Sequence, residues 1–407
     1  MSAPSGAAPV CTPMPATPDV DGGDYRVDIS ADVEPFLVRC AALSAAAASP
    51  FHAAGWLRCW YATLGRTAGR RPVLVGVRSR ATGADLLLLP LTARRVAGVS
   101  VVEFADASVV DYQLPLLAPA WVGGADEARR MWRVVRLALA GHDVLRIDKM
   151  LAHSLDEATP RSNPLMHVLR TVDCEMHGNQ IHVPGTWDEW RHNLPKRVRG
   201  EFGRLWRVFA RSPQARFEHV TDPQQALVVF EQLESQQAER MHGHTSRYVL
   251  DQPAYRAFYR DALRAGLVDG SVVLTALRDG DQLVAGQLGV ANGARYIALR
   301  LSTNRSEAWS HCSPGRLLLE RTAAHLHAQG LRWFDFGIGA YFHKTVFGVT
   351  AIPLFDAIEA LSWRGRPMVW AWRARRALKR QAWLVRVVRA VRVERRVVGR
   401  NASATGD

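Results

Sequence analysis

The chain has 407 residues, 48% of them hydrophobic and 22% charged, which is enough apolar material for two or three domains. Its five cysteines are scattered and none forms a C-x-x-C pair, which argues against a disulfide framework and a zinc site and for a reducing compartment. The formal net charge of +14 is uneven, because Trp363 to Arg400 carries +12 and residues 1–362 carry about +3. The charge therefore implies an anionic partner for the C-terminal segment alone.

The first 24 residues contain no Lys or Arg and no continuous apolar run, so they lack the parts of a signal peptide. We interpret residues 1–24 as a disordered leader. No apolar segment of 18 residues occurs in the chain, so the sequence predicts no membrane span. Together with the cysteine pattern, this predicts a cytoplasmic protein.

The same series of elements is predicted twice along the chain. A strand–turn–strand hairpin is followed by more strand, an amphipathic helix and a strand that carries an Asp near its end. The ranges are 72–95, 126–140 and a strand to Asp148 in the first half, and 271–293, 314–329 and a strand to Asp335 in the second. We interpret this as a duplicated α/β unit of roughly 150–180 residues.

A charged helical stretch connects the two units. Thr186 is a suitable N-cap, Glu189 lies in the first turn, and Pro195 is expected to kink or split the helix. The second part has a basic face, which we interpret as solvated rather than as a phosphate-binding surface: Lys196, Arg197, Arg199, Arg204 and Arg207.

Two further helices are predicted, from 223 to 241 and from 253 to 265, on either side of a polar loop. This loop contains His242 and His244. No third ligand lies near them in the sequence, so a metal site is not expected, and an acceptor-binding loop is the preferred interpretation.

The stretch "SPGRLLLE" predicts the start of the helix in the second unit. Ser313 is a natural N-cap and Pro314 suits the first helical position. Gly315 leaves the backbone bare, and Arg316 stands where its charge opposes the helix dipole. Two interpretations are open: Arg316 pairs with an anion bound at the helix N-terminus, or it points into water.

The basic C-terminal segment is predicted to form a two-faced helix from 370 to 398. Its tryptophans and many arginines suit an interfacial helix on an anionic membrane, through residues 363–400, at the inner face of the membrane. RNA phosphates and packing of the apolar face on the body remain alternatives.

Four stretches, in this order, carry a family resemblance: "SPFHAAGWLRCWYATLG", "VVDYQLPLLAP", "TWDEWRHNLPKRVRGEFGRLWR" and "SPGRLLLERTAAHLHAQGLRWFDFGIGAYFHKTVFG". They resemble the bacterial acyltransferase family related to cellulose-biosynthesis CelD-like proteins. This family belongs to the GNAT superfamily and is akin to the FemAB-type two-domain transferases. The resemblance covers roughly residues 28–362, and its most specific part is 313–348.

The resemblance implies an α/β fold with mixed sheets, built as tandem GNAT-like domains with a basic helical tail. We expect an N-terminal GNAT-like domain at 25–175, a C-terminal acyltransferase domain at 176–362 and the amphipathic tail at 363–407. It also implies an acyl-CoA donor, with acetyl-CoA as the first candidate, and no metal.

In such folds the fourth and fifth strands diverge and the pantetheine arm of CoA lies between them. The pyrophosphate rests on the N-terminus of the helix that follows the fourth strand. The resemblance therefore places the donor at Ser313, Gly315 and Arg316. It implies Tyr341 as the acid for the leaving thiolate, and Asp335 as the group that orients or deprotonates an acceptor amine.

The resemblance also suggests contacts to the acceptor. Lys344 stands in the family's Tyr–Lys position, with His343 in place of the Tyr, and is expected to bind an anionic substrate. Asp111 and Tyr112 match a recurrent pair in the first domain, and His244 lies in the polar loop; all three are expected to contact the acceptor.

Structural roles remain open for several of these residues. Tyr341 would also suit a half-buried helix start, Asp335 a capped turn, and Asp111 with Tyr112 a plain turn between strands. Gly315 is the one obvious counterpart of the family's acetyl-CoA loop, so the donor stays open between acyl-CoA and aminoacyl-tRNA.

The predicted function is transfer of an acyl group from CoA to an amine or hydroxyl. The acceptor would be a small molecule, a sugar, or a cell-envelope or exopolysaccharide precursor. The alternatives are aminoacyl-tRNA-dependent transfer, with tRNA as the one nucleic acid partner, and a non-catalytic membrane-surface protein with a degenerate transferase fold.

Overall fold

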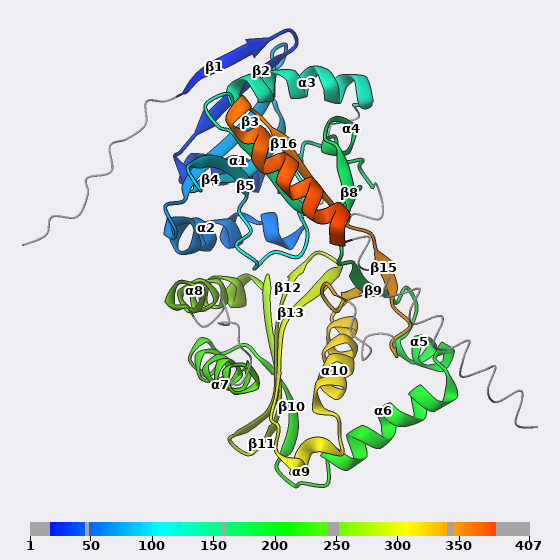
Figure 1. Ribbon diagram of the computed structural model, residues 1–407. Helices are drawn as coiled ribbons and strands as arrows, with labels where there is room; N and C mark the ends of the chain where they lie inside the picture. The colour runs from blue at the N-terminus through cyan, green and yellow to red at the C-terminus, as the bar shows by residue number, and fades with distance from the viewer. Residues whose placement is uncertain are drawn as a thin grey trace, which may run out of the picture.

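The computed structural model describes residues 17–44, 49–119, 121, 123–155, 160–241, 252–339 and 346–379 of the chain. Two domains lie one above the other, and each is a mixed β-sheet with helices packed on both faces (Figure 1). The predicted α/β fold with two mixed sheets is confirmed.

The first sheet has nine strands. Eight of them follow the order β1 (Thr17–Gly22), β2 (Tyr25–Ser30), β3 (Arg71–Ser79), β4 (Asp85–Val96), β5 (Val99–Phe104), β7 (Val144–Met150), β16 (Phe355–Ala360) and β8 (Thr171–Asp173), and β6 (Leu116–Leu117) pairs with β4. Helix α3 (Ala125–Ala138) packs on one face, and α1 (Val33–Ser44) and α2 (Ala54–Ala62) pack on the other. Apolar side chains point to both faces because successive residues of a strand alternate in direction. In β3, Val75 and Val77 face α3, and Leu74 faces the other helices.

The second sheet has seven strands. Their order is β10 (Ala215–Val220), β11 (Val272–Asp279), β12 (Gln282–Asn292), β13 (Arg295–Thr303), β14 (Trp333–Asp335), β9 (Gly178–His182) and β15 (Thr350–Ile352). Helices α7 (Pro223–Met241) and α8 (Pro253–Asp269) cover one face, and α6 (Lys196–Phe209) and α10 (Pro314–Ala328) cover the other. Two short helices, α5 (Trp187–Asn193) and α9 (Glu307–Ser310), precede α6 and α10.

Several helix boundaries follow the predicted signals. Thr186 caps α5 and forms a capping box with Glu189, and Pro195 separates α5 from α6. Helix α8 continues to Asp269, beyond the predicted end at 265, and stops where Gly270 adopts a left-handed φ of 73°.

Both sheets contain the same central unit, so the predicted repeat is present. In each, an antiparallel meander is followed by a crossover helix and a strand that returns parallel to the last strand of the meander. Strand β7 pairs in parallel with β5, and β14 pairs in parallel with β13.

Each sheet also contains strands from outside its central unit, and one of these strands crosses between the domains. Strand β9 precedes the second unit in sequence and pairs antiparallel with β14, whereas β16 follows that unit and returns to pair with β7 in the first sheet. Residues 355–360, which the sequence placed in the second domain, therefore lie in the first sheet. The return of β16 to the first sheet ties the two halves of the chain together.

The leader prediction was wrong for its last residues. Residues 17–22 form β1, which pairs antiparallel with β2 through a turn at Gly23, whose φ is 60°. The reason is local: a glycine turn beside the alternating strand "YRVDIS" lets the preceding residues join the sheet edge. Residues 1–16 lie outside the described part of the chain.

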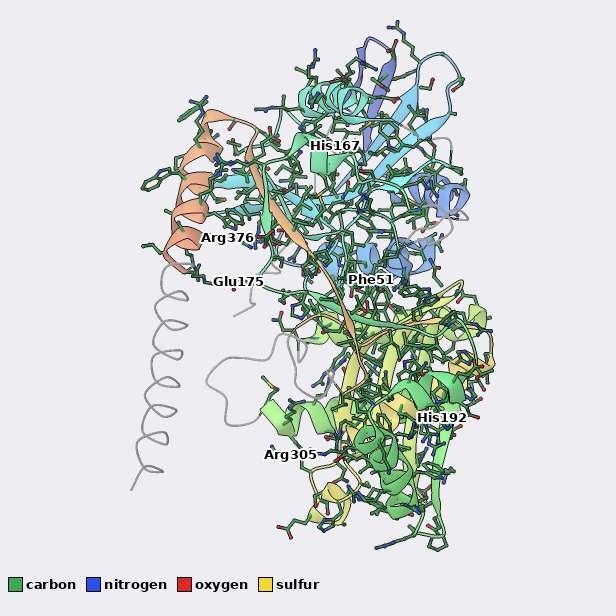
Figure 2. All side chains as sticks on the ribbon, turned by 90° about the vertical axis from the view of Figure 1, so that its right-hand side faces the viewer. Phe51, His167, Glu175, His192, Arg305 and Arg376 are labelled. Atoms are coloured by element: carbon green, nitrogen blue, oxygen red, sulfur yellow. The ribbon has the colours of Figure 1, made fainter. Side chains whose placement is uncertain are left out.

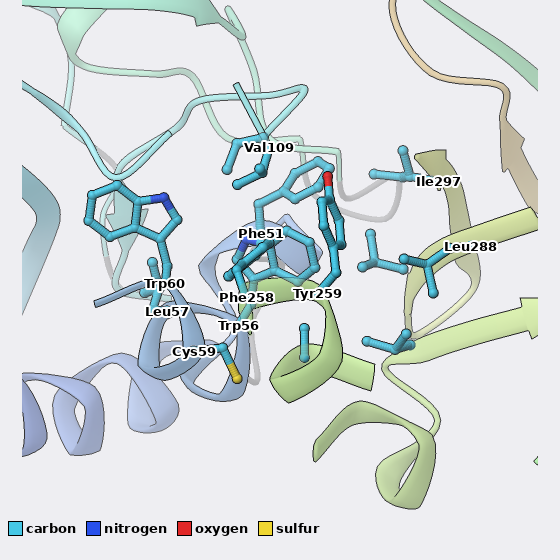
Figure 3. Close-up of a cluster of buried hydrophobic side chains, with 14 of the residues drawn as sticks. Phe51, Trp56, Leu57, Cys59, Trp60, Val109, Phe258, Tyr259, Leu288 and Ile297 are labelled. Atoms are coloured by element: carbon cyan, nitrogen blue, oxygen red, sulfur yellow. The ribbon is translucent and has the colours of Figure 1, made fainter. Parts of the chain in front are cut away.

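One hydrophobic core crosses the domain boundary (Figure 3). Trp56 of α2 stacks edge-on against Phe258 of α8 with ring centroids 4.8 Å apart, and Phe51 lies 5.6 Å from Trp56. These side chains belong to a buried cluster that includes residues of both sheets. An apolar interface of this kind holds the domains in a fixed relation, because separating them would expose the cluster to water.

After β16 the chain forms a short 3-10 helix, η4 (Trp363–Gly365), and then a helix over residues 366–379 on the outside of the first domain (Figure 1). The predicted tail helix is thus present as far as residue 379. Among the described helices, none combines the length and hydropathy that a membrane span requires.

Candidate functional site

The centre of the candidate site is the point where β13 and β14 part. The two strands pair in parallel over three residues, and the last pair joins Ile297 to Asp335. Strand β14 ends there, while β13 continues for six more residues to Thr303. Opposite β12, β13 carries one extra residue at Leu299, a β-bulge just beyond the last pair.

Asp335 is fully buried at this point. Its Oδ1 accepts a hydrogen bond of 2.8 Å from the Gly337 backbone N–H, and its Oδ2 accepts one from the Tyr112 hydroxyl. The turn-capping bond was one of the two roles open for Asp335. The bond to Tyr112 crosses from the second domain to the first, which no local turn requires.

Tyr112 is buried as completely as Asp335. Burial raises the pKa of its phenol well above the ordinary value, and the nearby carboxylates of Asp335 and Asp111 raise it further. The phenol therefore stays protonated and donates to Asp335. Gly178 of β9 permits this approach, because a Cβ at that position would overlap the Tyr112 hydroxyl.

Asp111 joins the same contact between the domains. Its Oδ2 accepts a hydrogen bond of 3.3 Å from the Ile338 backbone N–H, in the loop that follows β14. Gly337 adopts a φ of 78° there, and a Cβ on it would lie 2.8 Å from the Ala298 carbonyl oxygen. The structure therefore brings the pair Asp111 and Tyr112 together with Asp335, which the sequence had proposed as a separate site residue.

Asn179 of β9 is part of this arrangement and was missed by the sequence reasoning. It is 4% exposed, and its side-chain amide donates to the carbonyl oxygens of Gly337 and Gly339, both at 2.9 Å. It thereby holds the loop that leads toward residue 340. Only the pairing of β9 beside β14 places it there, and no motif in the sequence marks it.

The first domain holds Asp111 and Tyr112 through a small polar network. Asp106 accepts from the backbone N–H groups of Ser108 and Val110, at 3.0 and 3.2 Å, and pairs with Lys149 at 2.9 Å. Lys149 is 7% exposed and also donates to the Val110 carbonyl. This network fixes residues 106–110, immediately before the pair.

At the other end of β13, the α10 N-terminus differs from the prediction. Ser313 stands at the N-cap position, but with a left-handed φ of 45° its side chain makes no capping bond. Arg316 neither points freely into water nor stands alone, because it pairs with Glu201 of α6 and lies 3.4 Å from the Ser313 hydroxyl. Arg316 lies at the positive end of the helix dipole, where a cation is unfavourable, and the negative charge of the Glu201 carboxylate offsets this.

Gly315 lies against β13. A Cβ on Gly315 would lie 3.2 Å from the Thr303 side chain and 3.5 Å from Leu301. Since Thr303 is six residues beyond Ile297 along an extended strand, the α10 N-terminus lies roughly 20 Å from Asp335. The strand thus links the two parts of the candidate site at a fixed spacing.

A cavity of about 560 Å³ adjoins the Asp111 side of the site. It is lined by residues of the first domain, by helix 366–379 and by Ile338 in the loop after β14. Most of its charged side chains are paired, as in Arg146 with Asp148 at 2.7 Å and Arg376 with Asp356 at 2.6 Å. Burial raises the pKa of the Asp148 carboxyl. The lining includes Asp106, Asp111, Asp148, Lys149, Trp372 and Arg375.

Three predicted site residues, Tyr341, Lys344 and His244, lie outside the described residues. Among residues that are described, no group of three or more His, Cys, Asp or Glu side chains is placed to hold a metal ion. The sequence analysis did not identify Asn179, Gly178 or the Asp106–Lys149 pair as part of the site, because their roles depend on contacts between distant segments.

Residues 196–345 match a family model described as "Acetyltransferase (GNAT) domain". The chain is similar to a solved structure of FemX, at 12% identity and a TM-score of 0.55, over 84% of this chain and 98% of that one. It is also similar to a tandem GNAT protein from the clavulanic acid biosynthesis pathway, at 12% identity and a TM-score of 0.43, over 83% and 99%. A third is L-PGS from Bacillus licheniformis, at 12% and 0.45, over 79% and 95%.

A comparison with curated protein sequences finds no match. At 12% identity, the likeness to FemX shows the fold and not the reaction. The meander, crossover helix and diverging parallel strands occur in both domains, as expected for tandem GNAT-like units. Residues 196–345 of this chain therefore match the model of a GNAT-type acetyltransferase domain, and both domains of the chain have the GNAT-like arrangement of meander, crossover helix and parallel strand.

Proposed function

We propose that this protein transfers an acyl group from a CoA thioester to an amine or hydroxyl, with Asp335 at the reacting centre. The observation that carries the proposal is the buried Tyr112–Asp335 hydrogen bond at the point where β13 and β14 part. A carboxylate held by a residue of the other domain, at the end of a diverging strand, supports a role for Asp335 as the proton acceptor.

In the proposed reaction, the acceptor's nitrogen or oxygen attacks the thioester carbonyl and Asp335 orients the acceptor and takes its proton. The oxyanion of the tetrahedral intermediate is stabilised by a backbone N–H near the bulge at Leu299. The C–S bond then breaks, and the leaving thiolate takes a proton from Tyr341. Tyr112 acts on Asp335 alone, because its buried, protonated phenol fixes the carboxylate.

The donor is proposed to lie along β13, with its phosphates at Ser313, Gly315 and Arg316. The first N–H groups of a helix carry no intrahelical partner and attract anions. Arg316 is paired with Glu201, so donor phosphate would compete with that carboxylate for the guanidinium. Acetyl-CoA is the first donor to test, and aminoacyl-tRNA is the alternative, since FemX shares the fold.

The acceptor is proposed to occupy the cavity beside Asp111, with Asp111 and Tyr112 on the boundary to the reacting centre. A cavity lined by paired acidic and basic side chains suits a polar acceptor, such as a sugar or a cell-envelope or exopolysaccharide precursor. Lys344 and His244 are proposed as further acceptor contacts. A cytoplasmic location, peripheral at a membrane through residues 363–400, is proposed independently of this reaction.

The experiment begins with a thermal-shift screen of acyl-CoAs and aminoacyl-tRNA. A donor at a hundredfold excess over its Kd stabilises the folded state by about 2.7 kcal/mol. CoA release is then measured with a panel of amines and amino sugars for the wild type and Asp335→Asn. We expect the substitution to lower kcat/KM at least about 100-fold, because it removes the proton acceptor.

Asp222→Asn is the matched control. Asp222 accepts from the Gln225 backbone N–H at the start of α7, a bond that Asn also makes, so turnover should not change. Equal turnover in Asp335→Asn and the wild type would overturn the role of Asp335. Absence of a shift with every acyl-CoA would overturn the CoA donor and favour the tRNA-dependent or non-catalytic alternatives.

A further inference from the structure

Helix 366–379 is fixed to the first domain by its inner face. Val369, Met368 and Trp372 pack on a small buried cluster that includes Val144 and Ile358. At the other end, Arg376 pairs with Asp356 and donates to the Asp173 carbonyl. The helix is therefore a firm part of the domain, and its outer face has a defined direction (Figure 2).

The outer face is apolar, which is the reverse of an ordinary surface helix. Its residues recur at three- and four-residue spacing and none is charged: Pro367, Trp370, Ala371, Ala374, Ala377 and Leu378. Trp370 is 74% exposed and Leu378 is 66% exposed, and Trp363, just before the helix, is 76% exposed. These are three of the largest exposed apolar side chains in the described part of the chain.

Cations border this apolar face on both sides. Arg366 and Arg373 lie along one edge and Arg375 and Lys379 along the other, and no acidic residue occurs between 363 and 379. The neighbouring carboxylates belong to the body: Glu175, which is 3.2 Å from Lys379, and Asp356. The labelled Glu175 and Arg376 lie on the body side of the helix (Figure 2).

We propose that this outer face docks on an anionic lipid surface. An apolar arc with cations on both edges matches an interfacial helix, whose apolar side chains enter the acyl boundary while its cations meet the headgroups. Tryptophan is favoured at that depth because its ring is apolar and its N–H is polar. A second copy of the chain is a poorer occupant, because pairing two such faces would bring their cationic edges together.

Docking would also place the acceptor cavity near the lipid. Trp372 and Arg375 of the same helix line that cavity. The cavity and the lipid would then lie on opposite sides of one helix, about 10–12 Å across. The docking itself does not depend on the proposed reaction, so the two stand or fall by separate measurements.

The test is co-sedimentation of the full chain with vesicles of phosphatidylcholine, with and without phosphatidylglycerol. We expect binding to the anionic vesicles, and at least about a tenfold lower partition coefficient for Trp370→Glu/Leu378→Glu, because both substitutions put a charge into the apolar boundary. Val268→Glu is the matched control: Val268 is 83% exposed on α8, and its substitution should leave binding unchanged. Circular dichroism checks that each variant is folded.

Residues beyond 379 are present in every variant, so their contribution to binding cancels. Equal binding of Trp370→Glu/Leu378→Glu and the wild type would overturn the proposal. So would equal binding to vesicles with and without phosphatidylglycerol. Sedimentation equilibrium covers the remaining occupant: a dimer that the double substitution dissociates, with vesicle binding unchanged, would assign the face to a second copy.

Discussion

The two domains share the same central unit of meander, crossover helix and parallel strand, but differ at the start of the crossover helix. Helix α3 has Asp126 and Glu127 in its first turn, whereas α10 has no acid there and carries Arg316. Acidic side chains at a helix N-terminus satisfy the dipole from within and repel an anionic ligand. Of the two crossover helices, α10 is therefore the one without first-turn carboxylates, and it is the one at which we propose that the donor phosphates bind.

The two domains also differ in the chain segment that lies beyond the parallel pair of strands. Beyond the β5–β7 pairs, residues 105–114 fold back, and the Gln113 backbone bonds to Lys149 and Leu151 next to β7. That segment carries Asp111 and Tyr112 to the second domain. In the second domain, β13 runs on past the last β14 pair with a bulge at Leu299. One copy of the fold thus supplies a support and the other the proposed reacting centre.

The largest expected effect tests whether the two domains are energetically separate. Trp56→Ala should lower the free energy of unfolding by about 3–5 kcal/mol, because it empties the core shared with Phe258. Calorimetry should show one transition for wild type and variant. Trp370→Ala is the control, with a change of about 0.5 kcal/mol or less at an exposed site. Two transitions, of which one moves, would show that the domains unfold independently.

The second prediction concerns the histidines whose pKa values are lowered by burial, one in the first domain and two in the second. Burial lowers the pKa of His52, in the first domain, to about 4 from its ordinary 6.5. Between these values the unfolded chain binds a proton that the folded chain does not, so stability should fall by about 3 kcal/mol as the pH drops from 6.5 to 4. His219 and His325, in the second domain, also have pKa values lowered by burial.

Urea unfolding between pH 7 and pH 4 measures this dependence. His52→Leu should make the curve flatter over that range, whereas the same substitution at the exposed His192 should leave its slope unchanged. An unchanged slope in His52→Leu would place the acid sensitivity elsewhere, with the second domain's pair as the next candidate.

A smaller effect is expected at the contact that joins the domains. Gly178→Ala should cost about 1–3 kcal/mol of stability, since the added methyl meets the Tyr112 hydroxyl and must displace it from Asp335. Gly200→Ala in α6 has open space around it and should stabilise by about 0.5–1 kcal/mol. Thermal unfolding measures both, and equal signs would mean that the approach of Tyr112 to β9 is not tight.

The smallest effect is expected when α10 is given an acidic residue in its first turn, as α3 has. Gly315→Asp adds a first-turn acid and should weaken acetyl-CoA binding about threefold to tenfold, since a charge at a helix end contributes about 0.3–1 kcal/mol and up to 2. Gly315→Ala controls for bulk against Thr303. Calorimetric titration measures both Kd values. If Ala and Asp weaken binding equally, the donor does not sense charge at this helix.

Much of the fold could be predicted from the sequence, because the residues that determine it lie close together in the chain. The hairpins, the crossover helices and the split at Pro195 follow from periodicity, turn residues and caps that lie within a few positions of each other. Helix α7 has the predicted bounds for that reason. The positions of β9 and β16 were not readable, since pairing with β14 and β7 depends on partners far away in the sequence.

The candidate site divides in the same way. Asp335, Asp111 and Tyr112 were each proposed from the sequence, but nothing in it said that Tyr112 donates to Asp335. For Arg316 the sequence left a bound anion and water as alternatives, and the partner in the structure is neither, because Arg316 pairs with Glu201, on a helix 115 residues earlier. No motif in the sequence marks Asn179, because its role is to donate hydrogen bonds to two carbonyl groups of a distant loop.

The sequence by itself determined the repeated unit, several helix boundaries and the unequal charge of the chain, because backbone propensity and side-chain period act over short range. The tertiary structure decided which strand lies beside β14, which carboxylate meets Arg316 and which face of helix 366–379 is left outside. These depend on burial, which becomes favourable only when distant segments cover the same surface.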